Sequence, residues 1–218
     1  MSLRIAVAGS SLFTCPTLDR LYHHSPHEII AVITQPDKPT GRGRIKQPNP
    51  LKSLALSYDI PIWEPLKLNV EHWSHVLREH HLDCIVVAAY GRIMPETWLT
   101  IPRLGCLNIH ASLLPRWRGA SPIQQSLLHG DLLTGISIMQ MDQGLDTGDI
   151  LHQVEYTIGT KETSESLLST LADLGSHAIT DVLMRFGEYQ NKRKIQENEY
   201  ATSAPKLSKQ EAMIDWNN

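Results

Sequence analysis

An asparagine and a histidine two residues apart have the clearest capacity for chemistry in this sequence. Asn108 and His110 end the apolar run 106–110, which is typical of a strand. Alternate residues of a strand point to the same face, so these two lie roughly 6–7 Å apart at the backbone. An amide beside an imidazole can stabilise a carbonyl oxygen as it gains negative charge. The simpler alternative is a strand-end histidine satisfied by backbone groups, but the proline- and arginine-rich turn that follows favours a functional site.

A second candidate is the aspartate-rich loop between two predicted strands. Asp142, Asp146 and Asp149 lie within eight residues and are separated by two glycines. Glycines let a loop fold back and aim a carboxylate into a neighbouring cleft. The same residues also suit an ordinary hairpin loop. A carboxylate beside His110 would fix the orientation of the ring, but the sequence leaves open which of the three aspartates provides it.

A cationic segment stands out in a chain whose net charge is −3. Residues 35–52 carry a net charge of +4, with one acid, Asp37, and five basic residues: Lys38, Arg42, Arg44, Lys46 and Lys52. Such a patch on an acidic body predicts a phosphate-rich partner that docks at one place. The GxxxxGK[ST] phosphate loop is absent. Two interpretations remain open, a solvated loop or an arm that presents arginines to phosphates and base edges.

Composition excludes several classes of protein. With 41% hydrophobic and 20% charged residues, the chain is not wholly disordered. The longest apolar run, residues 85–90, is too short to span a membrane. Three cysteines without a CxxC motif favour a location in the reducing cytoplasm. Cys84 and Cys106 lie in apolar runs and are predicted to be core residues. His72 and His75 have no cysteine or carboxylate set to complete a zinc site, so no metal is expected.

Strands alternate with helices along the chain. Strands are predicted at residues 3–9, 28–34, 60–63, 83–89, 106–110, 135–141 and 150–158. Helices are predicted from the caps Ser10 and Ser11 to about residue 22, and at 51–58, 70–81, 121–128 and 163–185. This alternation predicts an α/β fold with a mostly parallel sheet and helices on both faces. Residues 35–50, with four prolines, are predicted to be a long functional loop.

Three segments together resemble the 10-formyltetrahydrofolate-dependent formyltransferases. They are 108–110, 112–119 and 144–148, and the similarity extends from Leu3 to about Trp216. The resemblance implies a Rossmann-like catalytic domain in which Asn108, His110 and Asp146 form the catalytic trio. It also implies that the 10-formyltetrahydrofolate cosubstrate binds along Ser112, Leu113, Leu114 and Pro115.

Segment 34–44 is similar to that of the family members that formylate methionyl-initiator tRNA for translation initiation. The resemblance therefore implies a methionyl-initiator tRNA partner, contacted by Arg42, Arg44 and Lys46. A sugar-nucleotide N-formyltransferase with the same chemistry on another amine is the enzymatic alternative, and a non-catalytic folate- or nucleotide-binding module is an alternative of another class. We also expect a monomer.

The resemblance further implies a division of the chain. Residues 1–190 would form the catalytic domain. The polar residues 191–218 would be a linker towards a C-terminal barrel domain that the family has and that is absent from this chain.

Overall fold

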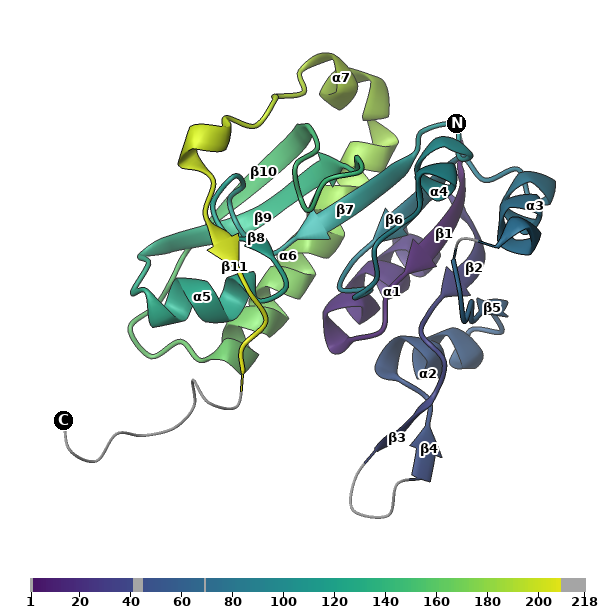
Figure 1. Ribbon diagram of the computed structural model, residues 1–218, viewed down its shortest axis with the longest axis horizontal. Coiled ribbons are helices and arrows are strands. Elements are labelled where there is room, and N and C mark those ends of the chain that lie inside the picture. Colours follow the sequence, from purple (N-terminus) through teal and green to yellow (C-terminus); the bar gives the residue numbers. More distant parts are fainter. Residues whose placement is uncertain (1, 41–44, 69, 209–218) are drawn as a thin grey trace.

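The computed structural model describes residues 2–40, 45–68 and 70–208, and a seven-stranded sheet lies at its centre (Figure 1). The strand order is β10-β9-β7-β6-β1-β2-β5. From β5 to β7 neighbouring strands are parallel, whereas β9 is antiparallel to β7 and to β10. The predicted mostly parallel sheet is therefore confirmed. The strands are β1 (Arg4–Ala8), β2 (Glu28–Ile33), β5 (Ile62–Trp63), β6 (Cys84–Val87), β7 (Cys106–His110), β9 (Leu133–Gln140) and β10 (Ile150–Thr157).

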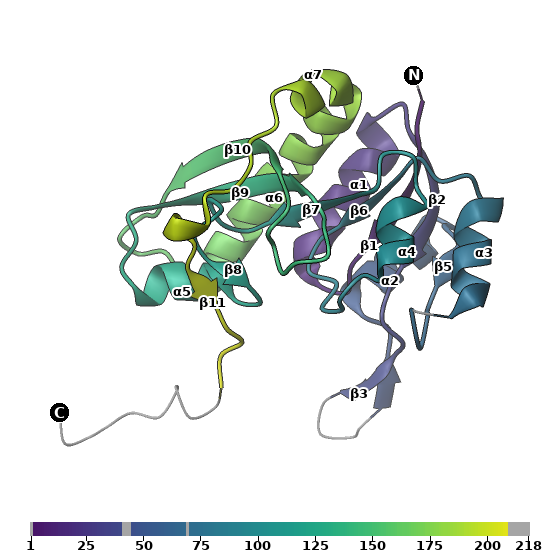
Figure 2. The ribbon, with the colours of Figure 1, turned by 45° about the horizontal axis from the view of Figure 1, so that its top comes forward.

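Helices cover both faces of this sheet, as the alternating pattern predicts (Figures 1 and 2). One face carries α1 (Cys15–His24), α2 (Pro50–Ser57), α5 (Pro122–Leu128) and α6 (Ser164–Met184). The opposite face carries α3 (Glu71–Glu79) and α4 (Glu96–Thr100). The pleat of β7 separates the two cores, because Leu107 packs in the first and Cys106 in the second. None of the helices in the described part of the chain combines the length and apolar character needed to cross a bilayer.

The start of the first helix differs from the prediction. A single 3₁₀ turn, η1 (Leu12–Thr14), precedes α1, and the side chain of Ser11 makes no capping hydrogen bond. Thr14 is instead drawn against the sheet, where its hydroxyl donates to the carbonyl oxygen of Ala88 at 2.7 Å. Gly9 permits this approach, because a Cβ atom there would lie 2.4 Å from Thr14 Oγ1.

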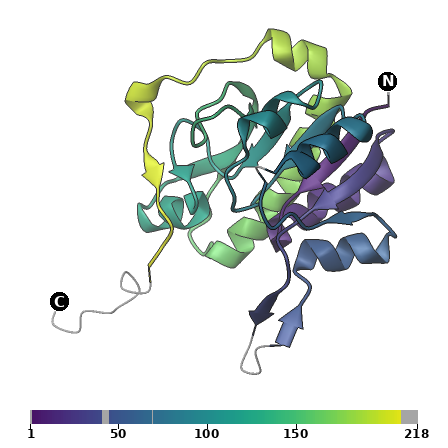
Figure 3. The ribbon, with the colours of Figure 1, turned by 45° about the vertical axis from the view of Figure 1, so that its right-hand side comes forward.

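The predicted loop 35–50 contains a pair of short strands that project from the body (Figures 1 and 3). Strands β3 (Lys38–Thr40) and β4 (Ile45–Gln47) pair antiparallel. The predicted tRNA-binding residues Arg42 and Arg44 lie outside the described residues, whereas Lys46 is exposed on β4. Lys52 does not add to a free cationic surface, because its ammonium lies 2.9 Å from carboxylate oxygens of both Asp37 and Glu64.

After α6 and α7 (Phe186–Asn191), residues 192–204 run back across the β9–β10 half of the sheet, and we name them the C-terminal strap (Figures 1 and 3). The strap contains η2 (Asn198–Tyr200) and β11 (Ser203–Ala204). Strand β11 pairs in parallel with β8 (Arg118–Gly119), and Lys194 exchanges two 2.8 Å backbone hydrogen bonds with Ile150. This part of the predicted linker is thus attached to the sheet and to the turn after β7.

Candidate active site

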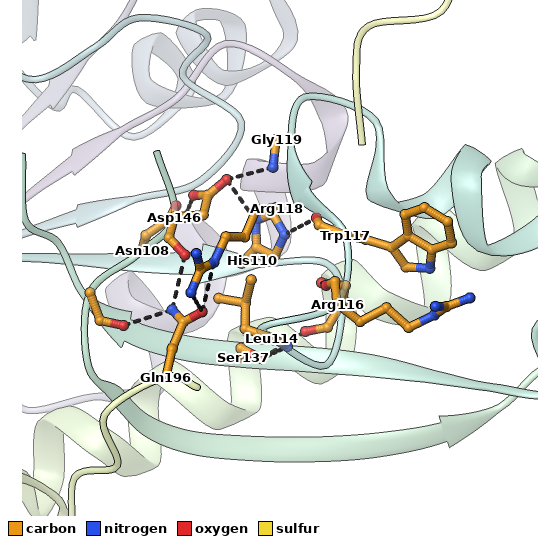
Figure 4. Close-up of polar contacts among 12 residues, drawn as sticks. Asn108, His110, Leu114, Arg116, Trp117, Arg118, Gly119, Ser137, Asp146 and Gln196 are labelled. Atoms are coloured by element: carbon orange, nitrogen blue, oxygen red, sulfur yellow. Dashed lines mark hydrogen bonds and ion pairs between the residues drawn. The ribbon is translucent and has the colours of Figure 1, made fainter. Parts of the chain in front are cut away.

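The site is built on the face of β7 opposite α6, at the carboxyl end of the strand beyond Cys106, which packs against Trp98 of α4. Leu107 and Ile109 point towards the core under α6, so the alternation of the strand turns Asn108 and His110 to the other face. There they are covered by the turn after β7, by the loop 141–149 and by the C-terminal strap (Figure 4). Only 9% of Asn108 and 5% of His110 is exposed.

Loop 141–149 folds back over this face and brings Asp146 to both residues. One carboxylate oxygen of Asp146, Oδ2, lies 3.6 Å from His110 Nδ1, and the other, Oδ1, accepts from Asn108 Nδ2 at 3.3 Å. Asp146 Oδ2 also accepts from the backbone N–H of Gly119 at 2.9 Å. The backbone of Asp146 is left-handed, with φ 53°, which is uncommon for a residue other than glycine and occurs often at functional sites.

The second ring nitrogen of His110 contacts the main chain. Its Nε2 lies 2.8 Å from the carbonyl oxygen of Trp117. Because a carbonyl oxygen only accepts, Nε2 carries a proton in this contact. Both ring nitrogens therefore face acceptor oxygens, from Trp117 and Asp146, and the ring is held between them (Figure 4).

The other two aspartates of the loop have separate partners. Asp142 Oδ1 accepts from the N–H of Gly144 at 3.0 Å and from the hydroxyl of Thr147 at 2.7 Å, so it shapes the turn. Asp149 pairs with Arg193 of the strap at 2.9 Å. Only Asp146 among the three lies within 4 Å of His110, which answers the question that the sequence left open.

The predicted folate segment is held by polar groups of the sheet. Ser137 of β9 donates to the carbonyl oxygen of Ser112 at 2.7 Å and accepts from the N–H of Leu114 at 3.0 Å. Gln153 of β10 donates to the carbonyl oxygen of Leu114 at 3.0 Å. The Ser112 hydroxyl is itself buried and donates to the carbonyl oxygen of Arg116 at 2.6 Å.

The predicted contact residues of this segment differ in exposure. Leu114 packs against Met139 and Ile150, whereas Leu113 and Pro115 are half-buried. Leu113 and Pro115 therefore offer more surface to a ligand than Ser112 or Leu114 does.

Beside the site, Asp131 fixes the turn that carries Trp117. Its carboxylate accepts from Arg116 at 2.9 and 2.6 Å and from Trp117 Nε1 at 2.7 Å. The hydrogen bonds from Arg116 are the largest cause that lowers the pKa of Asp131, while burial opposes them. The guanidinium of Arg116 also lies 4.3 Å above the ring of Trp117.

We expect Asp131→Asn to lower the free energy of unfolding by about 1–2 kcal/mol at pH 7, because charge-assisted hydrogen bonds are lost from a largely buried carboxylate. A lowered pKa in the folded state gives stability that is complete above the unfolded pKa of about 3.9 and is lost as pH falls through the folded pKa. Urea unfolding of wild type and variant should thus differ most at neutral pH and converge below about pH 4. A difference that is constant with pH would contradict this account.

Two cysteines and the two histidines of α3 lie in structural surroundings away from the site. Cys84 and Cys106 are fully buried, which confirms the prediction, and burial raises the pKa of the Cys106 thiol to about 12. On α3, His75 pairs with Glu79 at 3.0 Å and His72 lies against Trp73. Within residues 2–40, 45–68 and 70–208, no group of three or more histidine, cysteine, aspartate or glutamate residues is arranged to hold a metal ion.

Comparison with known proteins decides the family, because residues 3–183 match the family described as formyl transferase. The chain belongs to the formyl transferase family. The resemblance to the formyltransferases is therefore confirmed over residues 3–183, which include Asn108, His110 and Asp146.

Solved structures of this family share the fold. Glycinamide ribonucleotide transformylase 1 from Symbiobacterium toebii has a TM-score of 0.70 at 20% identity, over 90% of this chain and 95% of its own. Phosphoribosylglycinamide formyltransferase from Anaplasma phagocytophilum has a TM-score of 0.69 at 27% identity, over 91% and 92%. An N-formyltransferase from Helicobacter canadensis, in complex with folinic acid and dTDP-3-aminofucose, has a TM-score of 0.65 at 18% identity, over 93% and 71%. The sheet described above is thus the Rossmann-like sheet of the formyltransferases.

Some site residues carried no signal in the sequence analysis. The Trp117 carbonyl and the Gly119 N–H are main-chain groups, and side-chain patterns do not report their directions. Gly119 has φ 125°, and a Cβ atom there would lie 2.6 Å from the carbonyl oxygen of Ala204, so the glycine in the Trp-Arg-Gly run is the only local signal. Gln196 of the strap lies in a polar stretch with no periodic pattern.

Proposed function

We propose that this protein transfers a formyl group from 10-formyltetrahydrofolate to a primary amine. The observation that carries the proposal is the convergence of Asn108, His110 and Asp146 on one buried strand face in a member of the formyl transferase family. The folinic acid bound to the Helicobacter canadensis relative supports a folate as the formyl donor. The half-buried Leu113 and Pro115 would contact the folate, and Ser112 and Leu114 would fix the shape of that turn.

The reaction breaks the bond between the formyl carbon and N10 of the folate and forms a bond between that carbon and the amine. Negative charge develops on the formyl oxygen as the amine attacks. Asn108 has a second amide N–H beyond the one that faces Asp146, and this N–H would stabilise that oxygen together with the Nδ1 side of His110, which lies 3.6 Å from Asp146 and is therefore not committed to a hydrogen bond. Asp146 would orient His110 and help to manage the proton that leaves the amine, while N10 gains one.

For the acceptor we propose methionyl-initiator tRNA, bound by a cytoplasmic monomer. The likeness of segment 34–44 to the tRNA-acting members of the family supports this choice. The projecting strands β3 and β4 and the exposed Lys46 add a surface that could reach a large substrate. In this proposal residues 1–190 form the catalytic domain, to which the strap is attached, and the Arg42 segment meets the acceptor end.

A small phosphorylated amine is the second candidate. The Anaplasma phagocytophilum phosphoribosylglycinamide formyltransferase, 27% identical and of similar extent, favours it. A cavity of about 310 Å³ next to the β3–β4 pair has room for a small group, and both polar residues and prolines line it: Ser10, Gln35, Pro36, Asp37, Gln47, Pro48, Asn49 and Pro50. The two candidates share the trio and differ in what surrounds the amine.

Transfer of label from formyl-labelled 10-formyltetrahydrofolate to methionyl-tRNA, glycinamide ribonucleotide and an amino-sugar nucleotide tests the proposal. We expect Arg42→Ala to lower kcat/KM for methionyl-tRNA by about 10-fold and to change it less than about twofold for a small amine, because only the tRNA offers phosphates and bases to the arginine. Lys46→Ala should show a smaller loss with the same selectivity.

The matched control is Lys161→Ala, which removes an exposed lysine from the turn before α6 and should leave both substrates unaffected. If Arg42→Ala lowered kcat/KM equally for methionyl-tRNA and for the small amine, the tRNA assignment would be refuted. A wild-type preference for glycinamide ribonucleotide would establish the second candidate instead.

A further inference from the structure

The side chain of Gln196 enters the site from the C-terminal strap. Every other residue from 192 to 200 is exposed, whereas only 6% of Gln196 is accessible. Its Nε2 donates to the carbonyl oxygens of Asp146 at 2.9 Å and Gly148 at 2.8 Å. Its Oε1 accepts from Nε and Nη2 of Arg118 at 3.0 and 2.8 Å. One buried amide thus makes four hydrogen bonds beneath the site (Figure 4).

These four bonds join the two segments that determine where the Asp146 carboxylate lies. The first segment is the loop itself, whose left-handed backbone at Asp146 is held by the bonds from Nε2. The second is β8, where Arg118 precedes Gly119, and the N–H of Gly119 donates to Asp146 Oδ2. Gln196 therefore fixes both the main chain that carries the carboxylate and the group that binds it.

Attachment of the strap does not depend on this amide. Lys194 is joined to Ile150 by two backbone hydrogen bonds of 2.8 Å. Further along, β11 pairs with β8, and the N–H of Trp117 donates to the hydroxyl of Thr202 at 2.9 Å. With anchors on both sides of Gln196, the four bonds of its amide act on the loop and on β8 rather than on docking of the strap.

We propose that Gln196 is a positioning residue for formyl transfer, which keeps the Asp146 carboxylate facing Nδ1 of His110. The inference rests on the proposed function. None of these four hydrogen bonds reaches His110 or Asn108, so the effect of Gln196 on His110 passes through the position of Asp146. A small displacement of a catalytic group costs rate rather than ground-state binding, since geometry matters most in the transition state.

Three variants of the full chain test this. Gln196→Met keeps the length of the side chain and removes all four hydrogen bonds, and we expect kcat to fall about 10- to 100-fold while KM for both substrates stays within about twofold. Gln196→Glu keeps an acceptor for Arg118 but places a carboxylate oxygen against the carbonyl oxygens of Asp146 and Gly148. Its kcat should therefore fall at least as far as that of Gln196→Met. Asn198→Ala is the matched control, because Asn198 is exposed, accepts from Arg118 Nη2 at 3.0 Å and makes no bond to the loop. It should keep kcat within about twofold.

A second readout is independent of turnover. The ¹⁵N resonances of the His110 ring, assigned by their loss in His110→Ala, should shift in Gln196→Met and remain unchanged in Asn198→Ala. The midpoint of thermal unfolding of Gln196→Met should lie no more than about 5 °C below that of the wild type, which shows that the variant is folded. Unchanged kcat in Gln196→Met, or a loss of kcat matched by Asn198→Ala, would overturn the proposal. If the wild type formylates no amine, the proposed function fails, and the ring resonances alone decide whether Gln196 positions Asp146.

Discussion

Replacing His110 by alanine should lower kcat for formyl transfer by roughly 10²–10³-fold while the Kd of the folate changes less than about threefold. The imidazole lies on the buried face of β7 between the carbonyl oxygen of Trp117 and the carboxylate of Asp146. The ring is therefore held rigidly, and in the proposed mechanism its loss removes stabilisation of the formyl oxygen that exists only in the transition state. The measurement is single-turnover formylation beside equilibrium binding of the folate.

A control separates this effect from disturbance of the turn. His129 lies against the ring of Trp117, with 4.6 Å between centroids, and is exposed. His129→Ala should leave kcat within about twofold, although it also removes an imidazole from Trp117. Near-normal turnover in His110→Ala would show that another group stabilises the oxygen.

A comparable loss is expected from Asp146→Asn, about 10²–10⁴-fold in kcat. The amide keeps the size of the side chain but loses the negative charge that faces Nδ1 of His110 and can present N–H groups to that ring. An analogous change behind a catalytic histidine in serine proteases costs about 10⁴-fold. The pH dependence of kcat, measured together with its magnitude, should also change shape.

The same substitution at Asp142 provides the matched control. Both hydrogen bonds to Asp142, from Gly144 and Thr147, end on the same oxygen, Oδ1, and an asparagine retains that acceptor. Asp142→Asn should therefore keep the loop folded and kcat within about threefold. If Asp142→Asn abolished activity and Asp146→Asn did not, the assignment within the loop would be reversed.

The large elements of the fold were predictable because hydrophobic periodicity reports them directly. The predicted strand at 106–110 is β7 itself, and the helix predicted at 163–185 is α6, whose start is fixed by a capping box between Thr163 and Ser166. Several short elements were not predicted, although the two-residue β5 lies within the strand predicted at 60–63. Helix α4 is five residues long and begins after Pro95, and β3 and β4 are three residues each within a proline-rich segment. A five-residue helix holds little more than one 3.6-residue turn, and a three-residue strand holds a single alternation, so neither gives a repeating hydrophobic pattern.

The site was predictable to the extent that one strand defines it. Asn108 and His110 share a face because strand residues alternate, and that inference needs no tertiary information. The selection of Asp146 requires knowing that Asp142 closes the turn and that Asp149 pairs with Arg193, which depends on how the loop folds back. The contact of Gln196 with the loop could not be predicted from the sequence for a related reason. It is brought to the loop by a segment about 50 residues away in sequence, through contacts that side-chain composition does not encode.

The position of the strap sets an order of events during synthesis of the protein. A nascent chain that has left the ribosome as far as residue 190 already contains all seven strands of the central sheet and the three residues Asn108, His110 and Asp146. It lacks Gln196 and β11, which hold the Asp146 loop and the turn after β7. At roughly 5–20 residues per second these follow about one to three seconds later. The sheet is therefore complete before the site is, and on this account a growing chain gains full turnover only once residues 192–204 have emerged.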